Sequence, residues 1–400
     1  MKAQMSAHTL LAEKNLTKMH DIIYFGNDWY AENRTSSHHI AQQLSKNNTV
    51  LYVECPGLRS PNVSGRDFKK IIAKISNSLR KPRQISENLA VYTLFQIPFH
   101  RYALVRAINK ILIRTSIKRL IRQRRLSSPL LWFVIPHLST LPGTIPCKAV
   151  IYYCIDDYSA LPDIDSESVA KMDEQMTRMA DIVFIASDTL MEPKESLNER
   201  VYLNPHGVDF DHFNRVYTGK ATIPEDVAHL RENLVVGFFG LIEEWIDLEL
   251  VRFIAESHPK WHILMIGRVA VTSNPCRSLP NVHFIGRRDF QSLPGYAAVF
   301  SVGILPYKLN RQVINSNPIK LREYLAAGLP VVSVRFPQVE HYADVVSIAD
   351  NYEDFVSKIA TSFETDSEEL RRKRVDSVKT HTWEYRVKKA LEVVDDYLST

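Results

Sequence analysis

The chain has 400 residues, of which 45% are apolar and 24% are charged. That length is too great for one ordinary core and fits two domains of roughly 150–200 residues each, while the composition excludes a disordered chain. The formal net charge of +5 is modest, and no apolar run reaches the roughly 18 residues that span a membrane, which excludes an integral membrane protein.

The N-terminus and the cysteines indicate the compartment. Residues 1–21 contain no long apolar run, so we predict no secretory signal peptide. The four cysteines form no C-x-x-C pair and no Cys/His cluster with metal-ligand spacing. Scattered cysteines are typical of a reducing compartment, where they pack as small apolar groups. We expect a cytoplasmic protein, either soluble or peripheral on the inner face of the cell membrane.

Short apolar runs separated by helical patterns predict strands in the first half of the chain. The runs are rich in Val, Ile, Tyr and Phe, as buried parallel strands are, and turn residues bound them. They are Asp21–Gly26, Thr49–Glu54, Leu89–Leu94, Leu130–Ile135, Ala149–Cys154, Asp181–Ala186 and Val201–Gly207.

Two neighbouring histidines, His38 and His39, follow the first predicted strand. Ser36 or Ser37 would cap the helix that starts there. A histidine at that helix start would face the ligand-binding edge of the sheet, and we choose His38 as a candidate site residue. An ordinary surface histidine is the alternative for each. His206 lies near the expected domain junction and is a weaker candidate of the same kind.

Residues 101–125 contain nine Lys or Arg and no Asp or Glu. Helical spacing separates apolar residues from basic ones, with Leu104, Ile108, Ile111 and Leu112 on one face and Arg106, Lys110 and Arg114 on the other. The apolar face shifts after Thr115 and Ser116, which predicts a break or two helices. A basic amphipathic helix suits an anionic membrane surface, and a helix packed on the sheet is a compatible alternative. No recognition motif supports nucleic-acid binding.

Two aspartate pairs follow the strand Ala149–Cys154. Asp156 and Asp157 stand directly after its carboxyl end, where a carboxylate can act as a general base, although a turn or helix-cap role explains them equally well. We prefer Asp157. The pair Asp163 and Asp165 forms a D-x-D, a pattern that holds a metal in some enzymes; because it lies in a loop, we interpret it as helix-cap chemistry.

A second series of predicted strands follows a polar segment at Asn214–Ile223, where we place the domain boundary. These strands are Leu234–Gly240, Trp261–Gly267, Val282–Gly286, Phe300–Tyr307, Leu329–Val334 and Val345–Asp350. Two series of this kind predict two doubly wound α/β sheets. Ligands bind outside the carboxyl ends of such strands, so two facing sheets would share one cleft suited to two substrates.

The stretch Asn315–Ser333 carries the most chemical information. Asn317 is a suitable N-cap, Pro318 a suitable first helical residue, and Gly328 marks the helix end before a buried strand. The start of such a helix presents free N–H groups and the positive end of its dipole, which suit a diphosphate. Lys320 adds a positive charge in the first turn.

Glu323 lies one turn after Ile319, on the same face of this helix. Its carboxylate can accept hydrogen bonds from two vicinal hydroxyl groups, such as those of a ribose. A diphosphate at the helix start and a ribose one turn along have the spacing of a nucleotide. A plain helix with a solvated Glu323 is the alternative.

The sequence Asn317–Ser333, NPIKLREYLAAGLPVVS, resembles the nucleotide-sugar signature of GT-B glycosyltransferases, in particular family 4-like bacterial enzymes of surface-polysaccharide assembly. Five further segments resemble the family in the same order: Tyr152–Ser159, Asn204–Phe213, Gly237–Val251, Pro259–Arg268 and Leu279–Tyr307. The match spans roughly Asp21–Tyr397 and is specific as a set.

The resemblance implies the α/β fold class GT-B, two Rossmann-like doubly wound domains that face a central cleft. It implies an acceptor-binding domain at residues 1–215, a nucleotide-sugar domain at 216–382, and a helix at 383–400 that crosses back to the first domain. Trp383 would anchor that helix, for which ordinary packing is an equally consistent interpretation.

The resemblance also implies roles for the site residues. On the donor side, Glu323 would bind the ribose, and Ile319 and Lys320 would bind the phosphates. Gly240 would let the backbone approach the donor closely. Tyr307 and Asn315 would line the donor pocket. Arg268 ends a strand and would neutralise phosphate, with a surface ion pair as the alternative. On the acceptor side, Asp157 or Asp156 would deprotonate the acceptor hydroxyl, and His38 would orient the acceptor or the transferred sugar.

Two departures from the family pattern leave the stereochemistry open. Many retaining relatives carry two glutamates eight positions apart, and the first of these positions is Asn315 here. They also often carry Arg and Lys after the glycine that corresponds to Gly240, where this chain has Leu241–Trp245.

The function that the resemblance implies is hexosyl transfer from a UDP-, GDP- or ADP-linked sugar to a glycan or lipid-linked acceptor of a cell-surface polysaccharide. We expect no cofactor and no obligatory metal, because a helix start and positive side chains can stabilise the leaving group. The alternatives are a nucleotide-sugar epimerase of the same fold and a non-catalytic glycan- or membrane-binding protein. A dinucleotide oxidoreductase is disfavoured, because no G-x-G-x-x-G follows a strand.

Overall fold

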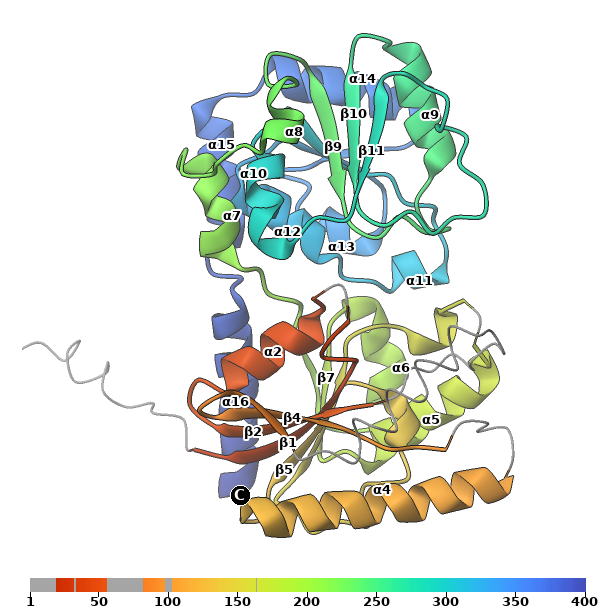
Figure 1. The fold of residues 1–400 in the computed structure, drawn as a ribbon, viewed down its shortest axis with the longest axis vertical. Helices are drawn as coiled ribbons and strands as arrows, with labels where there is room; N and C mark the ends of the chain where they lie inside the picture. The colour runs from red at the N-terminus through yellow and green to blue at the C-terminus, as the bar shows by residue number, and fades with distance from the viewer. Residues whose placement is uncertain (1–18, 32–33, 56–81, 98–102, 163) are drawn as a thin grey trace, which may run out of the picture.

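A computed structural model describes residues 19–31, 34–55, 82–97, 103–162 and 164–400. They form two α/β domains, one above the other in Figure 1, and the C-terminal helix runs back along the N-terminal domain. Within the described residues, no helix is both long and apolar enough to cross a membrane.

The N-terminal domain is built on one sheet of eight strands. They are β1 (Asp21–Gly26), β2 (Thr49–Glu54), β3 (Arg83–Ser86), β4 (Leu89–Thr93), β5 (Leu130–Phe133), β6 (Val150–Cys154), β7 (Ile182–Ile185) and β8 (Val201–Leu203). The order is β3-β4-β2-β1-β5-β6-β7-β8, with every neighbouring pair parallel except β3 and β4. The strand order reverses between β1 and β5, which makes the edge beside them a ligand-binding position in this kind of sheet.

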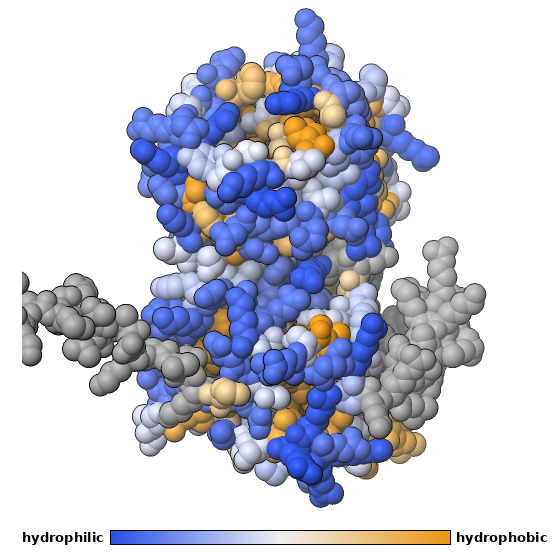
Figure 2. All heavy atoms as spheres, turned by 60° about the vertical axis from the view of Figure 1, so that its left-hand side comes forward, coloured by the Kyte–Doolittle hydropathy of each residue, from blue (hydrophilic) through white to orange (hydrophobic). Residues whose placement is uncertain are grey.

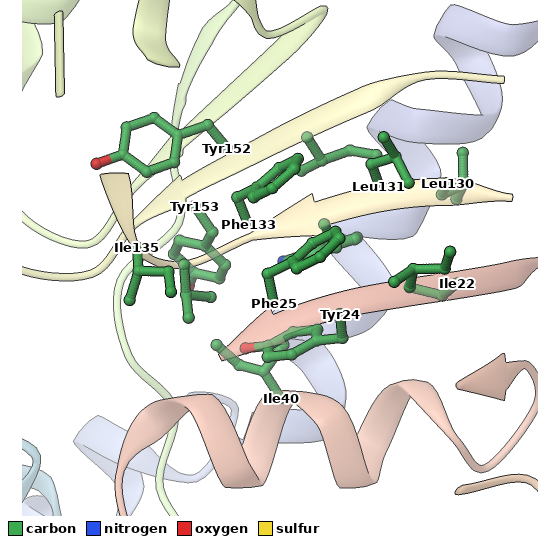
Figure 3. Packing of buried hydrophobic residues seen from close by; sticks show 14 of the residues in the cluster. Ile22, Tyr24, Phe25, Ile40, Leu130, Leu131, Phe133, Ile135, Tyr152 and Tyr153 are labelled. Atoms are coloured by element: carbon green, nitrogen blue, oxygen red, sulfur yellow. The ribbon is translucent and has the colours of Figure 1, made fainter. Parts of the chain in front are cut away.

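Helices cover both faces of this sheet. They are α2 (Ser36–Leu44), α4 (Ala103–Arg124), α5 (Ser166–Met179) and α6 (Met191–Glu195), with short 3-10 turns η1 (Pro136–Leu138), η2 (Tyr158–Ala160) and η3 (Asp188–Leu190). The central strands are buried, and aromatic rings fill the space between them. Phe25 of β1 and Phe133 of β5 stack with their ring centroids 4.4 Å apart, and Ile40 of α2 packs beside Tyr24 (Figure 3).

The C-terminal domain is built on a six-stranded parallel sheet. Its strands are β9 (Val235–Phe239), β10 (His262–Ile266), β11 (Val282–Gly286), β12 (Val302–Leu305), β13 (Val331–Val334) and β14 (Ser347–Ala349). The order is β11-β10-β9-β12-β13-β14, which is the 3-2-1-4-5-6 order of the dinucleotide-binding sheet, with its reversal between β9 and β12.

The connections of this domain are mostly short helices. They are α7 (Phe210–Tyr217), α8 (Glu225–Ala228), α9 (Leu248–Ser257), η4 (Phe290–Ser292), α10 (Leu293–Ala297), α11 (Arg311–Ile314), α12 (Ile319–Ala326), α13 (Pro337–Glu340), α14 (Tyr352–Glu364) and α15 (Glu368–Val378). The final helix is α16 (Trp383–Ser399). On the face where α7, α15, α16 and α2 come forward, the surface is mostly hydrophilic, with apolar atoms in small separate patches (Figure 2).

The chain crosses between the domains twice. Asn204 still hydrogen bonds to β7, whereas Val208 packs in the core of the second domain, so the first crossing lies between these residues, ahead of the expected boundary at residues 215 and 216. The chain returns between Val378 and Trp383. The two crossing segments pair with each other, because the Val208 N–H donates to the His381 carbonyl at 2.9 Å.

Helix α16 belongs to the N-terminal domain by its packing. Trp383, only 2% exposed, lies in that domain's core together with Val387, Leu391 and Val394 of the same helix. A fully buried apolar side chain of this size contributes about 1.5–3 kcal/mol. The predicted crossing helix is therefore present, and Trp383 lies at its first turn.

The predicted fold class, two Rossmann-like domains of the GT-B type, is confirmed. Every predicted strand is present, and β1, β2 and β11 have the predicted bounds. The strand β3 was not predicted. It is the antiparallel edge strand, and all four of its residues are exposed, so it lacks the apolar pattern on which the strand predictions rest.

The predicted break in the basic stretch was wrong. Helix α4 runs unbroken past Thr115 and Ser116. Its packed face carries Ile113, Ile117 and Leu120, which are buried, whereas three residues of the predicted apolar face, Leu104, Ile108 and Ile111, are exposed. The two apolar stripes lie on different sides of one helix, so the shift in pattern after residue 116 reflects a second apolar surface and no helix break.

Candidate active site

Two predicted site residues stand where the strand order of the C-terminal sheet reverses. Gly240 directly follows β9, and Tyr307 lies just after β12. A ligand of a doubly wound sheet binds outside this point. Helices α11 and α12, which continue the chain after β12, lie on the side of this domain that faces the N-terminal domain (Figure 1).

Gly240 is held in a conformation that only glycine adopts readily, with φ +145°. A Cβ atom on this residue would lie 2.0 Å from Cε and 2.7 Å from Nζ of Lys320. At the end of the neighbouring β10, Gly267 has φ +147°, and a Cβ there would lie 1.8 Å from the Gly240 carbonyl oxygen. The glycine at 240 therefore gives the Lys320 side chain its path across the strand end.

Helix α12 starts after Pro318, which is its N-cap, so the prediction that Asn317 is the N-cap was wrong. The Asn317 side chain instead donates to the Ala186 carbonyl of the N-terminal domain at 2.6 Å and accepts from Arg322 at 2.5 Å. No side chain among the described residues caps α12. Its first-turn N–H groups thus remain available to an anion, together with the positive end of the helix dipole.

Glu323 is buried and Lys320 is half-buried at the start of α12. Burial raises the pKa of Glu323 to about 7, against the opposing effect of Lys320, and burial lowers the pKa of Lys320. Neither side chain makes a hydrogen bond to any residue that the structure describes. Burying two such groups without polar partners is costly. A ligand with phosphate and hydroxyl groups would supply the missing partners for both.

Three further residues of the predicted donor site differ in their surroundings. Tyr307 is buried near Glu323, and burial together with that carboxylate raises its pKa. Ile319 packs against the core of the N-terminal domain, so the start of α12 lies at the domain interface. The Arg268 side chain is 57% exposed and lies 4.0 Å from the Glu243 carboxylate, which is the surface ion pair considered as its alternative.

Asn315 and Asp157 meet across the domain interface. One oxygen of the Asp157 carboxylate accepts from the Asn315 amide and from Arg311 Nε, each at 2.8 Å, and the other accepts from the Ser159 hydroxyl at 2.7 Å. Arg311 also donates to the Ser159 hydroxyl at 2.8 Å. We call Asp157, Ser159, Arg311 and Asn315 the interdomain clamp. An acceptor hydroxyl can reach the Asp157 carboxylate only by displacing one of these donors.

The clamp residues Arg311 and Ser159 were not predicted from the sequence. Ser159 lies two residues after Asp157 in η2, and Arg311 begins α11 in the loop between β12 and α12. An arginine in a loop at a strand end is a general signal for anion binding, and nothing in the sequence pairs it with residue 157. The pairing depends on how the two domains meet, which no local pattern encodes.

Asp156 has the acid–base properties expected of a proton acceptor near neutral pH. Burial, with a further contribution from the neighbouring Asp157 charge, raises its pKa to about 7. One of its carboxylate oxygens accepts the Asp157 N–H at 3.0 Å. Of the two predicted aspartates, Asp157 has its carboxylate bound by the side chains of the interdomain clamp, whereas Asp156 does not.

His38 holds the loop after β1 with both ring nitrogens. Nδ1 accepts the Thr35 N–H at 3.1 Å, and Nε2 lies 3.2 Å from the Asp28 carbonyl oxygen. The ring also packs 5.3 Å from that of Trp29. Burial lowers the pKa of His38, so it stays uncharged. Its position at the start of α2 agrees with the prediction, but its nitrogens face the loop.

The other two histidines pack at the domain junction. The His39 ring stacks on Trp383 at 5.1 Å and contacts Phe290 of the C-terminal domain at 5.6 Å. His206 lies 5.7 Å from the same tryptophan. Burial lowers the pKa of each to about 3, so both are neutral packing groups.

The D-x-D pair and the cysteines carry no site chemistry in the part that is described. Asp165 is the N-cap of α5 and accepts from the Ser168 N–H at 3.2 Å, as expected, while Asp163 lies outside the described residues. The described residues contain no group of three or more His, Cys, Asp or Glu placed to hold a metal. None of the four cysteines forms a disulfide bond.

Comparison with known proteins gives a family match and a relative that aligns over about three quarters of the chain. Residues 234–364, which carry α12 and the donor-side candidates, match the family described as "Glycosyl transferases group 1". The chain is also 25% identical over 329 residues to TuaH of Bacillus subtilis (strain 168), a protein assigned to teichuronic acid biosynthesis as a glycosyltransferase. That alignment covers 77% of each chain.

Solved structures share the fold over nearly the whole length. Sucrose-phosphate synthase from Thermosynechococcus elongatus has a TM-score of 0.69 at 13% identity, covering 95% of this chain and 99% of that one. HepE of Anabaena, solved in complex with UDP and glucose, has a TM-score of 0.60 at 14% identity, covering 95% of this chain and 100% of its own. Both domains and their connections thus have counterparts in these structures.

Proposed function

We propose that this chain, a glycosyltransferase of the GT-B fold and of surface-polysaccharide type, transfers a sugar from a nucleoside diphosphate sugar to a hydroxyl of a growing or lipid-linked glycan. The observation that carries the proposal is the pair of a half-buried Lys320 and a buried Glu323 beside the uncapped start of α12, neither with a side-chain hydrogen bond to a residue that the structure describes. The relation to a teichuronic acid biosynthesis protein supports a polysaccharide acceptor.

The donor would lie along the start of α12. The first-turn N–H groups, from Ile319 onward, and the Lys320 ammonium would bind the diphosphate. Glu323, one turn along, would accept hydrogen bonds from the ribose hydroxyls. Gly240 would let the phosphates approach the end of β9, because it carries no Cβ. Tyr307 would close the apolar side of the pocket.

The reaction would replace the bond between the sugar and the diphosphate with a bond to the acceptor oxygen. Negative charge develops on the leaving diphosphate, where α12 and Lys320 would stabilise it, and we propose that no metal is obligatory. The acceptor hydroxyl loses a proton. Asp156, with its pKa near 7, suits that transfer better than Asp157, whose carboxylate lies in the interdomain clamp. His38 would act by fixing the loop after β1.

The acceptor side is consistent with a membrane surface. Helix α4 exposes Leu104 and Ile111, which are 72% and 66% exposed, and Ile108 lies between them on the same stripe. By helical spacing the exposed residues Arg119 and Arg122 continue that stripe along the helix. Apolar residues flanked by basic ones bind anionic lipid surfaces. We propose that the protein is cytoplasmic and binds the inner membrane face through α4, where a lipid-linked acceptor would be presented.

Binding of nucleotide sugars tests the donor site directly. We would titrate UDP-, GDP- and ADP-linked sugars calorimetrically and follow thermal unfolding in parallel, because a ligand that binds only the folded state raises its stability. At least one should bind, and Glu323→Ala should raise its Kd about 100-fold, since two hydrogen bonds to a charged group are lost. The control Glu369→Ala changes an exposed residue of α15. Equal affinity in wild type and Glu323→Ala would refute the ribose assignment.

Product analysis separates transfer from epimerisation. With donor alone, a transferase releases nucleotide only slowly through hydrolysis, whereas an epimerase converts the sugar without any acceptor. Rapid conversion of the donor sugar in the absence of an acceptor would exclude our proposal.

A further inference from the structure

A cavity of about 470 Å³ lies at the junction of the domains, away from Lys320 and Glu323. Asp188 and Leu203 of the N-terminal domain form one wall, α12 and α13 with Tyr342 form another, and Arg386 of α16 closes it. Cavities of this volume hold small-molecule ligands. Because the walls come from both domains, an occupant would contact both.

Two arginines, Arg322 and Arg386, line this cavity without a carboxylate partner among the described residues. Arg322 is 3% exposed; one of its terminal nitrogens donates to Asn317, and its Nε has no hydrogen-bond partner. The Nε of Arg386 is also buried without a partner. Burial, with a further contribution from the Arg322 charge, lowers the pKa of Arg386. Arg322 is buried and Arg386 is half-buried, so the two like charges repel each other, and an anion bound between them would relieve this repulsion.

The remaining charged groups of the lining are two carboxylates, Asp188 and Asp344, and one further cation, Lys373. The Asp188 carboxylate accepts from His341 at 2.7 Å and from Gln338, so its oxygens are already engaged. Asp344 is exposed, and Lys373 adds a third cation, donating only to the Asp344 carbonyl, at 3.2 Å. The three cations of the lining thus outnumber its two carboxylates, and the Nε atoms of Arg322 and Arg386 lack hydrogen-bond acceptors.

We propose that this cavity binds the phosphate group of a small phosphate ester, with Arg322 and Arg386 as its ligands. Guanidinium groups bind phosphate oxygens through paired hydrogen bonds, and the buried Nε atoms would gain acceptors in this way. The apolar wall, including Leu203 and Tyr342, would contact the rest of the molecule. The volume exceeds that of a bare phosphate, which favours an ester over the free ion.

This site is separate from the proposed donor site, although both use α12. Residues two positions apart on an α-helix point about 200° apart, so Arg322 projects from the side of α12 opposite to Lys320. A ligand beside Arg322 therefore leaves the Lys320 side chain free to bind a donor. The proposal does not depend on which donor the enzyme uses.

Calorimetric titration with inorganic phosphate and with glucose 6-phosphate, at constant ionic strength in chloride buffer, tests the site. We expect saturable binding of the ester, weaker binding of the free ion, and a rise in Kd of about tenfold or more in Arg322→Gln and in Arg386→Gln, the size of a lost charge-assisted hydrogen bond. Arg322→Lys should retain part of the affinity. The matched control is Arg372→Gln, an exposed arginine of α15 outside the cavity.

The variant Lys320→Met distinguishes this site from the donor site. If the phosphate ester binds at the cavity, Lys320→Met leaves its Kd unchanged, whereas Arg386→Gln weakens it. The proposal is overturned if wild type shows no saturable binding of the ester, if Arg372→Gln weakens it as much as the cavity variants do, or if Lys320→Met alone abolishes it. Should Arg322→Gln fail to fold, Arg386→Gln and Lys373→Gln carry the test.

Discussion

The Asp157 carboxylate and the Asn315 side-chain amide meet at 2.8 Å, although they belong to different domains. Asp157 is the N-cap of η2, shortly after β6, and Asn315 is the C-cap of α11 in the loop that leads to α12. Arg311 reinforces the contact by donating to the same carboxylate oxygen. The clamp thus joins the expected acceptor side to the loop that precedes the donor helix.

The clamp should appear as energetic coupling in catalysis. We expect Asp157→Ala and Asn315→Ala each to lower kcat/KM and the double variant to lower it by less than the product of the two, with a coupling free energy on the order of 1–2 kcal/mol, because the residues share one hydrogen bond. The measurement is a double-mutant cycle on transfer rates. The matched pair Arg335→Ala and Asp350→Ala breaks an exposed ion pair within one domain and should leave the rates unchanged. If the free-energy effects of Asp157→Ala and Asn315→Ala on kcat/KM simply add, the contact between these two residues does not contribute to catalysis.

The buried Glu323 should make the enzyme less stable as pH rises. Its pKa is raised to about 7 in the folded state and is near 4.5 in the unfolded chain, so the folded state holds a proton that the unfolded state releases in between. The stabilisation from this proton is complete below about pH 4.5 and is lost as pH rises to about 7, a change on the order of 3 kcal/mol.

Glu323→Gln should therefore gain in Tm relative to wild type between pH 5 and pH 8, while nucleotide binding is lost. The measurement is thermal unfolding of both proteins across that range without ligand. Glu369→Gln, an exposed glutamate, should track wild type at each pH. A difference between Glu323→Gln and wild type that is constant with pH would mean that the carboxylate is ionised throughout.

Lys320→Met should separate donor affinity from folding. We expect the Kd for the bound nucleotide to rise about 10- to 100-fold, since a hydrogen bond from a charged donor to phosphate is lost, with little loss of Tm because methionine fills a similar volume without a buried charge. Calorimetry and thermal unfolding of the same preparation give both values. A large fall in Tm with unchanged nucleotide affinity would assign the ammonium a structural role.

Gly240→Ala should weaken donor binding through both strain and displacement. The φ of +145° costs a side chain about 1–3 kcal/mol, and the new methyl group occupies the space of Lys320 Cε. Gly219→Ala is the control, because Gly219 also has positive φ but has open space around it. We expect both variants to lose Tm and only Gly240→Ala to lose nucleotide affinity. Equal nucleotide affinity in the two variants would contradict this prediction.

The exposed stripe of α4 should bind anionic vesicles. Each basic side chain near such a surface contributes about 1 kcal/mol, so the double variant Arg119→Gln with Arg122→Gln, at two residues that continue the exposed stripe, should partition about 30-fold less onto phosphatidylglycerol-containing vesicles. Ile111→Asp should weaken binding further at any lipid charge. Co-sedimentation measures both. The control replaces two exposed lysines of the other domain, Lys220→Gln with Lys260→Gln, and unchanged binding of the α4 variants would exclude this helix as the contact.

The strands and the donor-side geometry could be predicted from the sequence because their signals are local. A buried strand is a continuous apolar run, and β1, β2 and β11 have the predicted bounds for that reason. Lys320 and Glu323 could be placed together because helical periodicity fixes their separation. The strand β3 and the packed side of α4 could not be predicted in this way, because both depend on which surfaces other segments of the chain pack against.

The acceptor side was harder to predict because its contacts join distant segments. Asp157 looked like a free general base in the sequence, whereas Arg311 and Asn315 bind it from the other domain. His38 looked like a residue facing a ligand, yet its nitrogens are taken by its own loop. A pattern over a few residues says which chemical group stands at a strand end, and the tertiary structure decides what that group contacts.

The pairing of the two crossing segments has a mechanical consequence. Because Val208 and His381 are hydrogen bonded, the segments that carry the chain up and down form a single two-stranded hinge. The two segments therefore cannot twist independently of each other. The two domains can rotate relative to one another mainly about one axis, which passes through the paired segments. Displacement grows with distance from that axis. A rotation of a few degrees would therefore open or close the side of the domain interface farthest from the paired segments, while Val208 and His381 barely move.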